Sequence, residues 1–171
     1  MTDQSVTNTH GVPMPKHIIS GLKYLAAVEL RKNNFTQKEI AEKLEMDRST
    51  VSHYLNGRNI SWHSIEIAEI IRNFCPRDFS TLTYALLQDK KKTRTIVKIC
   101  SNKMFKCMVK NTCIGCGVCA DACITEAIVL DDLEAQINSD WCCGCMICME
   151  ICPTKSIEIK EVEDDGDYRN Y

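Results

Sequence analysis

Several features are missing from this 171-residue sequence, and each absence narrows what the protein can be. It has no run of 18 apolar residues, so no segment is predicted to span a membrane. Its first residues, MTDQSVTNTHGVPMP, lack the basic start and the apolar stretch of a secretory signal. We therefore interpret residues 1–13 as a disordered leader and expect a cytoplasmic protein.

Signatures of catalysis are also missing. The sequence contains no glycine-rich loop that could cradle a phosphate, and no convincing Ser–His–Asp or Cys–His set. The four histidines lie far in sequence from most of the cysteines, at His10, His17, His53 and His63. We therefore expect a protein that is not an enzyme.

Cysteine is almost absent from the first 99 residues, where Cys75 is the single example among 12 in the chain. Without a secretory signal, this usage favours metal ligands over disulfides. Charge divides in a similar way. Residues 1–95 hold 14 Lys and Arg against 10 Asp and Glu, a net charge of +4, whereas residues 96–171 hold 7 against 13, a net charge of −6. Two domains with different partners are predicted.

The first domain is predicted to be helical. Apolar residues recur at helical spacing over residues 16–33 and predict a first helix. The segment FTQKEIAEKLEMDRSTVSHYLNGR, residues 35–58, follows. Thr36 and Glu39 have the spacing of a capping box, so a second helix is predicted over residues 37–44.

A three-residue turn, residues 45–47, then leads to a third helix over residues 48–55, which Asp47 can cap. Two short helices joined by so tight a turn must cross steeply, which is helix-turn-helix geometry. The outward face of the third helix carries polar side chains that can reach base edges or phosphates in a major groove. These are Arg48, Ser49, Thr50, Ser52, His53 and Asn56, with Arg58 just beyond the helix.

The stretch TQKEIAEKLEMDRSTVSHYLNGR resembles the helix-turn-helix of the phage-repressor-like (XRE-type) DNA-binding family. The segments SWHSIEIAEIIRNF, 61–74, and FSTLTYALLQ, 79–88, are similar to its fourth and fifth helices, so the likeness covers residues 16–89. It implies a five-helix domain, 14–90, that binds double-stranded DNA. By this resemblance Gln37 touches phosphate, and the bases are read or approached by Arg48, Ser49, Thr50, Ser52 and His53.

Three points in this domain stay open. Glu45 stands where the family usually has glycine, at a cost of about 1 kcal/mol in a left-handed conformation. His53 could instead be a plain surface histidine, and the whole domain could be a helical bundle for protein contact. We expect Cys75 to be a buried small hydrophobic residue.

Residues 91–104 are predicted to be a linker or strand. The basic run at residues 90–94 has the composition of a solvated linker, and TIVKICSNKMFKCMVK, from residue 95, that of a strand or hairpin. Cys100 and Cys107 on this segment could form a third metal site or a redox pair, or they could pack in the interior.

Two cysteine runs, CIGCGVCADACI and CCGCMICMEICP, lie 29 positions apart and share the spacing C-x₂-C-x₂-C-x₃-C. Gly115 and Gly144 also match, as do Thr125 and Thr154, which indicates an internal duplication. Four-cysteine runs favour iron–sulfur clusters, because zinc sites favour separated CxxC pairs.

These runs resemble the bacterial-type two-cluster 4Fe–4S ferredoxins, over residues 105–160. The resemblance implies a small α+β domain with two 4Fe–4S clusters, each taking its fourth ligand from the other repeat. The first cysteine set is then Cys113, Cys116, Cys119 and Cys152, and the second cysteine set is Cys142, Cys145, Cys148 and Cys123. Ile124 replaces the family's proline after Cys123, while Pro153 follows Cys152.

The surroundings of the two sets are predicted to be apolar. Cys143 occupies the position of Ile114 in the other repeat, so we expect it to be buried filler. Residues 161–171 form an acidic, solvated tail. The side chains expected to exclude water from the clusters are Ile114, Val118, Ile128, Ile147, Ile151 and Ile157.

The prediction as a whole is a two-domain α+β protein, an all-α helix-turn-helix domain followed by a ferredoxin-like domain with duplicated repeats. The fusion indicates a transcription regulator that binds DNA as a homodimer, controlled by the redox state or integrity of two 4Fe–4S clusters. The dimer contact could come from the 79–89 helix or from the ferredoxin half. Two alternatives are an electron-transfer protein whose helical domain docks a redox partner protein, and a DNA-binding protein with purely structural clusters.

Overall fold

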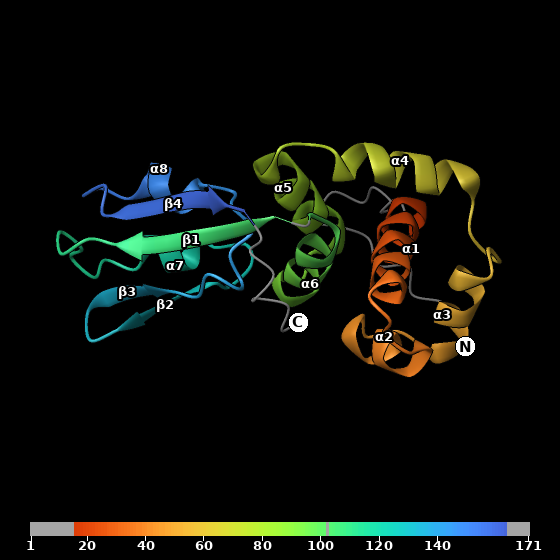
Figure 1. Cartoon of the computed structure of the whole chain (residues 1–171). Coiled ribbons are helices and arrows are strands. Elements are labelled where there is room, and N and C mark those ends of the chain that lie inside the picture. The colour runs from red at the N-terminus through yellow and green to blue at the C-terminus, as the bar shows by residue number, and fades with distance from the viewer. Residues whose placement is uncertain (1–15, 102, 164–171) are drawn as a thin grey trace, which may run out of the picture. The chain divides into compact units, whose positions relative to one another are not determined.

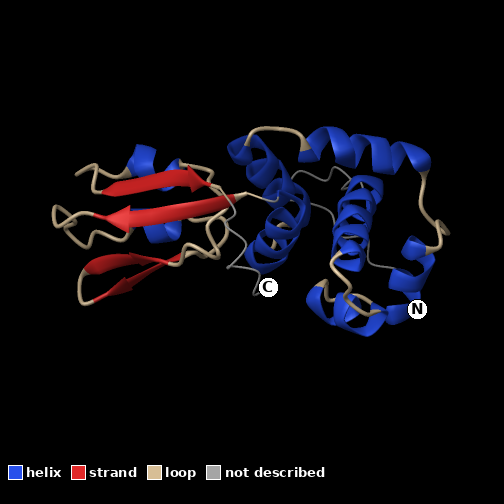
Figure 2. Ribbon diagram, viewed as in Figure 1, coloured by secondary structure: helices blue, strands red, loops and turns tan. Residues whose placement is uncertain are grey.

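The computed structural model describes residues 16–101 and 103–163, and the chain divides into two compact units, 1–70 and 71–171. The first unit is helical, and the second combines helices with two small antiparallel sheets (Figure 1 and Figure 2). None of the described helices combines the length and the apolar character needed to cross a membrane. The predicted leader, 1–13, lies outside the described residues.

The first unit is built from α1 (Lys16–Lys32), α2 (Gln37–Lys43), α3 (Arg48–Leu55) and most of α4 (Trp62–Arg72). Helix α1 packs against both α2 and α3, so its apolar face becomes the centre of this unit. The ring of Tyr24 on α1 meets that of Tyr54 on α3 edge to face, with centroids 6.2 Å apart. The buried core includes Leu22, Ala26, Leu30, Ile40, Val51 and Ala68.

The start of α2 and the turn between α2 and α3 agree with the sequence prediction in all but one detail. Thr36 and Glu39 form the capping box, with the Thr36 N–H donating to the Glu39 carboxylate at 2.7 Å and the Glu39 N–H donating to Thr36 Oγ1 at 3.3 Å. Glu45 adopts the expected left-handed conformation, with φ of 49°. Asp47 stands at the N-cap of α3, but its side chain makes no capping hydrogen bond, so the predicted cap is wrong in this detail.

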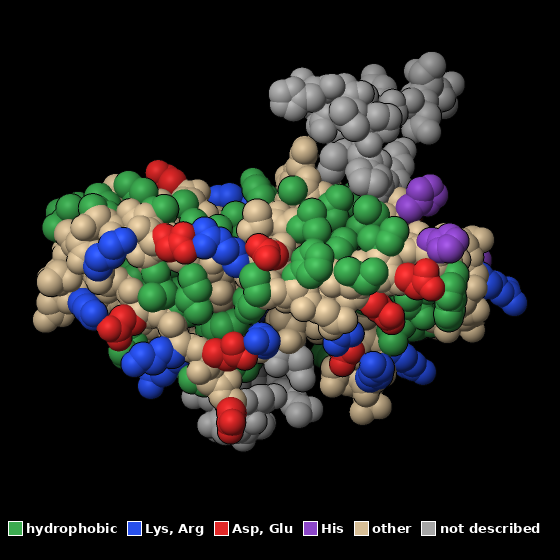
Figure 3. Space-filling model, turned by 90° about the horizontal axis from the view of Figure 1, so that it is seen from above, with side chains coloured by type: hydrophobic (Ala, Val, Ile, Leu, Met, Phe, Trp, Pro, Cys, Tyr) green, Lys and Arg blue, Asp and Glu red, His purple; other side chains and the backbone are tan. Residues whose placement is uncertain are grey.

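Helix α4 exposes large apolar side chains although it belongs to the core of the first unit through Ala68. Trp62 is 73% exposed, and Ile67 and Ile70 are exposed as well. Hydrophobic side chains gather over α4 in the space-filling view of Figure 3. The division between the units falls inside this helix, between Ile70 and Ile71.

The second unit begins with the packed helices α5 (Pro76–Leu87) and α6 (Lys90–Ser101). The predicted linker or strand at 91–104 is therefore wrong up to residue 101. Burial on α6 follows the helical period through Thr93, Ile96, Val97 and Cys100. The β-branched residues that favoured a strand pack instead against α5, and the predicted domain boundary at residue 90 does not coincide with the division at residue 70.

Cys75 is exposed, so the prediction that it is buried is wrong. It occupies the N-cap of α5, immediately before Pro76, and has extended backbone angles. Since this position precedes the helical turns that bury Phe79 and Ser80, its side chain lies outside the packed face.

Strand β1 (Met104–Val109) pairs with β4 (Ile157–Val162), and β2 (Ile128–Asp131) pairs with β3 (Glu134–Ile137). Both pairs are antiparallel, and the β2–β3 hairpin lies beside β1 (Figure 1). The short helices α7 (Val118–Asp121) and α8 (Ile147–Ile151) hold the middle of each cysteine run. Of the predicted acidic tail, residues 161 and 162 belong to β4, and residues 164–171 lie outside the described chain.

Candidate metal centres and nucleic-acid interface

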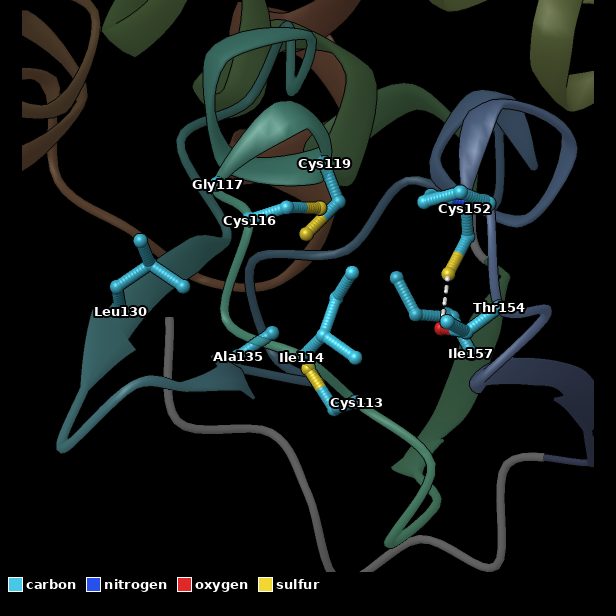
Figure 4. A pocket seen from close by; sticks show the side chains of 11 residues that line it. Cys113, Ile114, Cys116, Gly117, Cys119, Leu130, Ala135, Cys152, Thr154 and Ile157 are labelled. Atoms are coloured by element: carbon cyan, nitrogen blue, oxygen red, sulfur yellow. Dashed lines mark hydrogen bonds between the residues drawn. The ribbon is translucent and has the colours of Figure 1, made fainter.

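All four members of the first cysteine set line one pocket. Cys113, Cys116 and Cys119 come from the first run, and Cys152 comes from the second (Figure 4). The pocket holds about 330 Å³ of empty space, part of it open to solvent. The fold thus brings the thiol of Cys152 to the three thiols of the first run, which lie more than 30 positions earlier in the sequence.

The fourth cysteine of each run sits in a matching hydrogen-bond environment. The N–H of Ala127 donates to Cys123 Sγ at 3.2 Å, and the N–H of Ser156 donates to Cys152 Sγ at 3.3 Å. The hydroxyls of Thr125 and Thr154 lie 3.6 and 3.5 Å from the same two sulfurs (Figure 4 shows the second). Donors aimed at sulfur favour thiolates, which are the form that binds metal.

Glycine is required at the start of each run. Gly115 and Gly144 have φ of 65° and 70°, a left-handed conformation that favours glycine. A Cβ on Gly115 would lie 2.2 Å from the carbonyl oxygen of Leu133, and one on Gly144 would lie 2.2 Å from the ring of Phe105. Each loop therefore curls tightly under its neighbouring segment.

The four thiols of the second cysteine set are all buried. Burial raises the pKa of Cys148 to about 12, and the nearby thiol of Cys123 acts in the same direction. The pKa of Cys142 is raised first by a hydrogen bond with Cys107 and then by burial. In the first set, burial opposes ionisation of Cys152, but hydrogen bonds from Thr154 and the Ser156 N–H lower its pKa to about 7.

The donor chemistry of both sets fits iron–sulfur clusters. Thiols are the ligands these clusters use, and the first set surrounds a space instead of one point. Within the described residues, no three Cys, His or carboxylate side chains converge closely enough to hold a single metal ion. This arrangement suits a polynuclear cluster better than a zinc ion, whose ligands must meet at about 2.3 Å from one atom.

The predicted apolar surroundings are found at some of the named positions and not at others. Ile128 and Ile157 are buried as expected, but Ile114 is 64% exposed and Val118 and Ile151 are exposed too. The prediction is wrong at these three positions. Ile114 lines the pocket of the first set, which is partly open to solvent.

Helices α5 and α6 supply contacts to the cysteine-bearing segments that the sequence did not reveal. Arg77 on α5 forms a two-pronged ion pair with Glu150 on α8, with N–O distances of 2.5 and 2.8 Å. Arg94 on α6 donates to the carbonyl of Thr125 at 3.1 Å and stacks over Trp141, 3.8 Å from the ring centroid. The partners Glu150, Thr125 and Trp141 lie one or two positions from cysteines of the second set.

Lys98 on α6 makes the deepest of these contacts. Its Nζ lies 3.4 Å from the carbonyl oxygen of Cys142, and the residue is 5% exposed. Burial lowers the pKa of Lys98, and the neighbouring groups, Cys142 foremost, oppose that shift. A lysine in the middle of TIVKICS gave no sign in the sequence that it would be buried.

The remaining cysteines pack near the second set. Cys143 is 2% exposed, as predicted for filler, and its thiol contacts Ser80 on α5 and Thr125. Cys100 is buried on α6, and Cys107 on β1 lies against Cys142. Cys100 and Cys107 thus lie on different elements, one helix and one strand, and not on the single strand or hairpin predicted.

The predicted DNA-contacting residues are gathered on α3 and at its flanks. Arg48 and Ser49 are exposed at the start of the helix, and Thr50, Ser52 and His53 are half-buried. Asn56 is exposed, but its side-chain amide donates to the Ser52 carbonyl at 2.8 Å and so is partly engaged by its own helix. Gln37 at the start of α2 is half-buried, and Arg58 is exposed beyond α3.

Helix α3 suits a polyanion. Its eight residues, RSTVSHYL, contain no acidic side chain, while Val51 and Tyr54 hold its other face in the core. The polar residues therefore stand on a rigid element with their outer face open. This combination is what groove-reading helices provide.

Comparison with known proteins supports both halves. A helix-turn-helix family model matches residues 29–80, and a 4Fe-4S dicluster domain model matches residues 112–156. No solved structure matches the chain. The protein named "Ferredoxin-type protein FwdE" from Methanocaldococcus jannaschii is 37% identical over 128 residues, which are 74% of this chain and 84% of that protein. The chain, a helix-turn-helix joined to a 4Fe–4S domain, therefore belongs to the family of the ferredoxin-type protein FwdE.

Proposed function

We propose that this protein is an iron–sulfur transcription regulator. In this proposal α2 and α3 bind double-stranded DNA sequence-specifically, and the first and second cysteine sets each hold one 4Fe–4S cluster. The redox state or the integrity of these clusters controls DNA binding. A bound cluster supplies one-electron redox chemistry and a covalent cross-link between the two repeats.

The observation that carries the proposal is the anchoring of α5 and α6. These helices follow directly after α4 in the chain, and Arg77, Arg94 and Lys98 fasten them to segments that bear the second cysteine set. A change in how those segments are held is passed to α5 and α6 through these contacts. Clusters that served electron transfer alone would not require such anchoring.

Cluster loss is the stronger of the two signals. Gain of one electron changes the charge by one, which is worth about 1–4 kcal/mol at close range. Loss of ligation removes what holds Cys123 and Cys152 against the opposite repeats, and a domain of about 55 residues buries too little apolar surface to stay folded alone. The segments contacted by Arg77, Arg94 and Lys98 would then lose their structure.

A homodimer is part of the proposal, because helix-turn-helix proteins read two half-sites about 34 Å apart. The apolar face of α5, one of the two predicted sources of the dimer contact, is covered by α6. Trp62, Ile67 and Ile70 on α4 are exposed and offer apolar surface for a second copy.

The test begins with anaerobic purification and an assay of iron and sulfide, followed by genome-wide DNA selection with cluster-loaded, reduced and cluster-free protein. We expect the loaded and cluster-free forms to bind one operator with different affinity. Arg48→Ala should weaken operator binding by about 1–3 kcal/mol, while Lys38→Ala, an exposed residue on α2, serves as the control of equal charge change. Equal operator affinity in all three states would contradict the proposal and leave the clusters as structural elements.

Electron transfer is the second candidate, favoured by the open pocket of the first set and the apolar side chains around it. The printed name of the relative, a ferredoxin-type protein, points the same way. This candidate predicts reversible low-potential reduction and a redox partner protein, with no operator recovered in the selection. The same experiment therefore separates the two functions.

A further inference from the structure

Lys98 is the only charged residue among the buried side chains of the described chain. It lies on the buried face of α6 beside Val97, with Ile96 and Cys100 on neighbouring positions of that face. Two other lysines of the second unit are more exposed and have carboxylate partners. Lys103 pairs with Glu161, and Lys110 pairs with Glu158.

The ammonium of Lys98 has no carboxylate in contact with it, and the carboxylate of Asp140 acts on it only from a greater distance. No carboxylate of the described residues lies within 4.0 Å of it, and its single hydrogen bond goes to the Cys142 carbonyl at the long distance of 3.4 Å. Burying a cation without a paired anion is strongly unfavourable, because water is removed and nothing replaces it. A buried ammonium in this state indicates an anion that the polypeptide does not provide.

Cys142, the residue that Lys98 contacts, is the first member of the second cysteine set. A 4Fe–4S cluster with four thiolates carries a net charge of about −2 or −3. We infer that Lys98 is the counter-cation of the second cluster, positioned by α6 on its Cys142 side. This inference rests on the proposed binding of clusters by the two cysteine sets.

Among the described residues, no buried lysine contacts the first cysteine set; Lys90 donates to the carbonyl of Asp121 at 3.4 Å, but it is not buried. The N–H of Cys113 donates to the carbonyl of Lys110, but the Lys110 side chain is half exposed and is neutralised by Glu158. A fixed positive charge favours the more negative, reduced state of the group beside it. Lys98 therefore raises the reduction potential of the second set above the value that this set would have without the lysine.

The position of Lys98 also identifies α6 as the helix that responds to the charge of the second cluster. The attraction between Lys98 and the second set grows by one charge when that set is reduced, and Lys98 belongs to a helix packed against α5. Lys98 acts here as a positioning and tuning residue for the cluster and makes no contact with DNA in this inference.

The experiment uses the full chain, purified without air, with Lys98→Met and Lys98→Arg. Methionine keeps much of the volume and removes the charge, and arginine keeps the charge. Lys103→Met is the matched control, since it removes a lysine that contacts no cysteine. Iron and sulfide are assayed first, and a dithionite titration followed by electron paramagnetic resonance then gives the two midpoint potentials.

We expect all variants to hold about eight iron atoms per chain, and Lys98→Met to lower one midpoint and leave the other unchanged. Lys98→Arg should restore the lowered midpoint, and Lys103→Met should change neither. Unchanged midpoints in iron-loaded Lys98→Met, or equal shifts in the methionine and arginine variants, would overturn the inference. Loss of half the iron in Lys98→Met but not in Lys98→Arg would support it, and loss in both would overturn it in favour of packing. Wild-type protein without iron and sulfide would instead overturn the proposed function.

Discussion

The two cysteine runs have the same backbone conformation at matching positions, but the two cysteine sets differ in the solvent exposure of their thiols. Gly115 and Gly144 have φ of 65° and 70°, and Glu126 and Lys155 have φ of 55° and 50°, so the two repeats turn alike at positions 29 apart. Yet Cys116 of the first set is exposed, whereas every thiol of the second set is buried. The two loops thus share their backbone geometry, while their environments differ.

The difference originates in α5 and α6. Position 143 lies under Ser80 of α5 and is 2% exposed, while the equivalent Ile114 is 64% exposed. Two helices that the sequence assigns to a DNA-binding domain and a linker thus cover one set and leave the other open. One ferredoxin-like domain can in this way hold one accessible and one enclosed site.

The largest expected effect is that of removing iron. Chelation after oxidation should abolish the β1–β4 and β2–β3 pairs, because Cys123 and Cys152, which we propose as ligands shared with the opposite repeat, would lose their partners. Hydrogen exchange followed by mass spectrometry should show loss of protection over residues 104–162, with α1–α3 unchanged. Strands that remained protected without iron would show that the apolar core suffices, and the clusters would be accessory.

Iron release should occur in two phases, because only the first set is open to solvent. We expect the rates to differ by about tenfold or more, equal to about 1.4 kcal/mol in barrier height. Stopped-flow absorbance with an iron chelator measures both phases. Cys116→Ala should remove the fast phase and Cys145→Ala the slow one, and the reverse assignment would break the contrast between the sets.

Met146 offers a smaller test of the shared backbone. It has φ of 61° at the position that Gly117 occupies in the other repeat. Met146→Gly should therefore stabilise the cluster-loaded protein by about 1 kcal/mol, measured by chemical denaturation without air. Met149→Gly within α8 is the control and should destabilise by about 1 kcal/mol; equal effects of the two would deny any strain at Met146.

The smallest effect is expected from the surface pair that joins α5 to α8. Arg77 and Glu150 are both about half exposed, so Glu150→Gln should lower the stability only slightly. The slow phase of iron release should quicken slightly and the fast phase should stay constant. Glu161→Gln, which breaks the Lys103 pair instead, should alter neither phase. A change confined to the fast phase in Glu150→Gln would contradict the assignment of α5 to the second set.

Local signals made much of the fold predictable. The Thr36–Glu39 capping box and the turn at Glu45 involve neighbours in sequence, and both formed as expected. The resemblance of the cysteine runs to two-cluster ferredoxins implied that Cys152 lies with Cys113, Cys116 and Cys119, and these four residues line one pocket. These features depend on contacts within a few residues or on a pattern repeated twice.

Features that depend on distant packing could not be predicted. The β-branched run around Ile96 and Val97 resembles a strand, and only the presence of α5 makes a helix bury it. Ile114 and Cys143 occupy equivalent positions, so nothing local indicates that one is open and the other covered. The burial of Lys98 follows from the same unrecognised helix packing.

Helix α4 carries an experimental consequence of its own. Because the division between the units falls between Ile70 and Ile71, no loop is available there at which the chain could be dissected. Truncation at this point would cut α4, which runs from Trp62 to Arg72, within its last turn. A recombinant half that ended there would carry an incomplete helix with exposed apolar side chains at its terminus. DNA affinity and metal content should therefore be measured on the intact polypeptide.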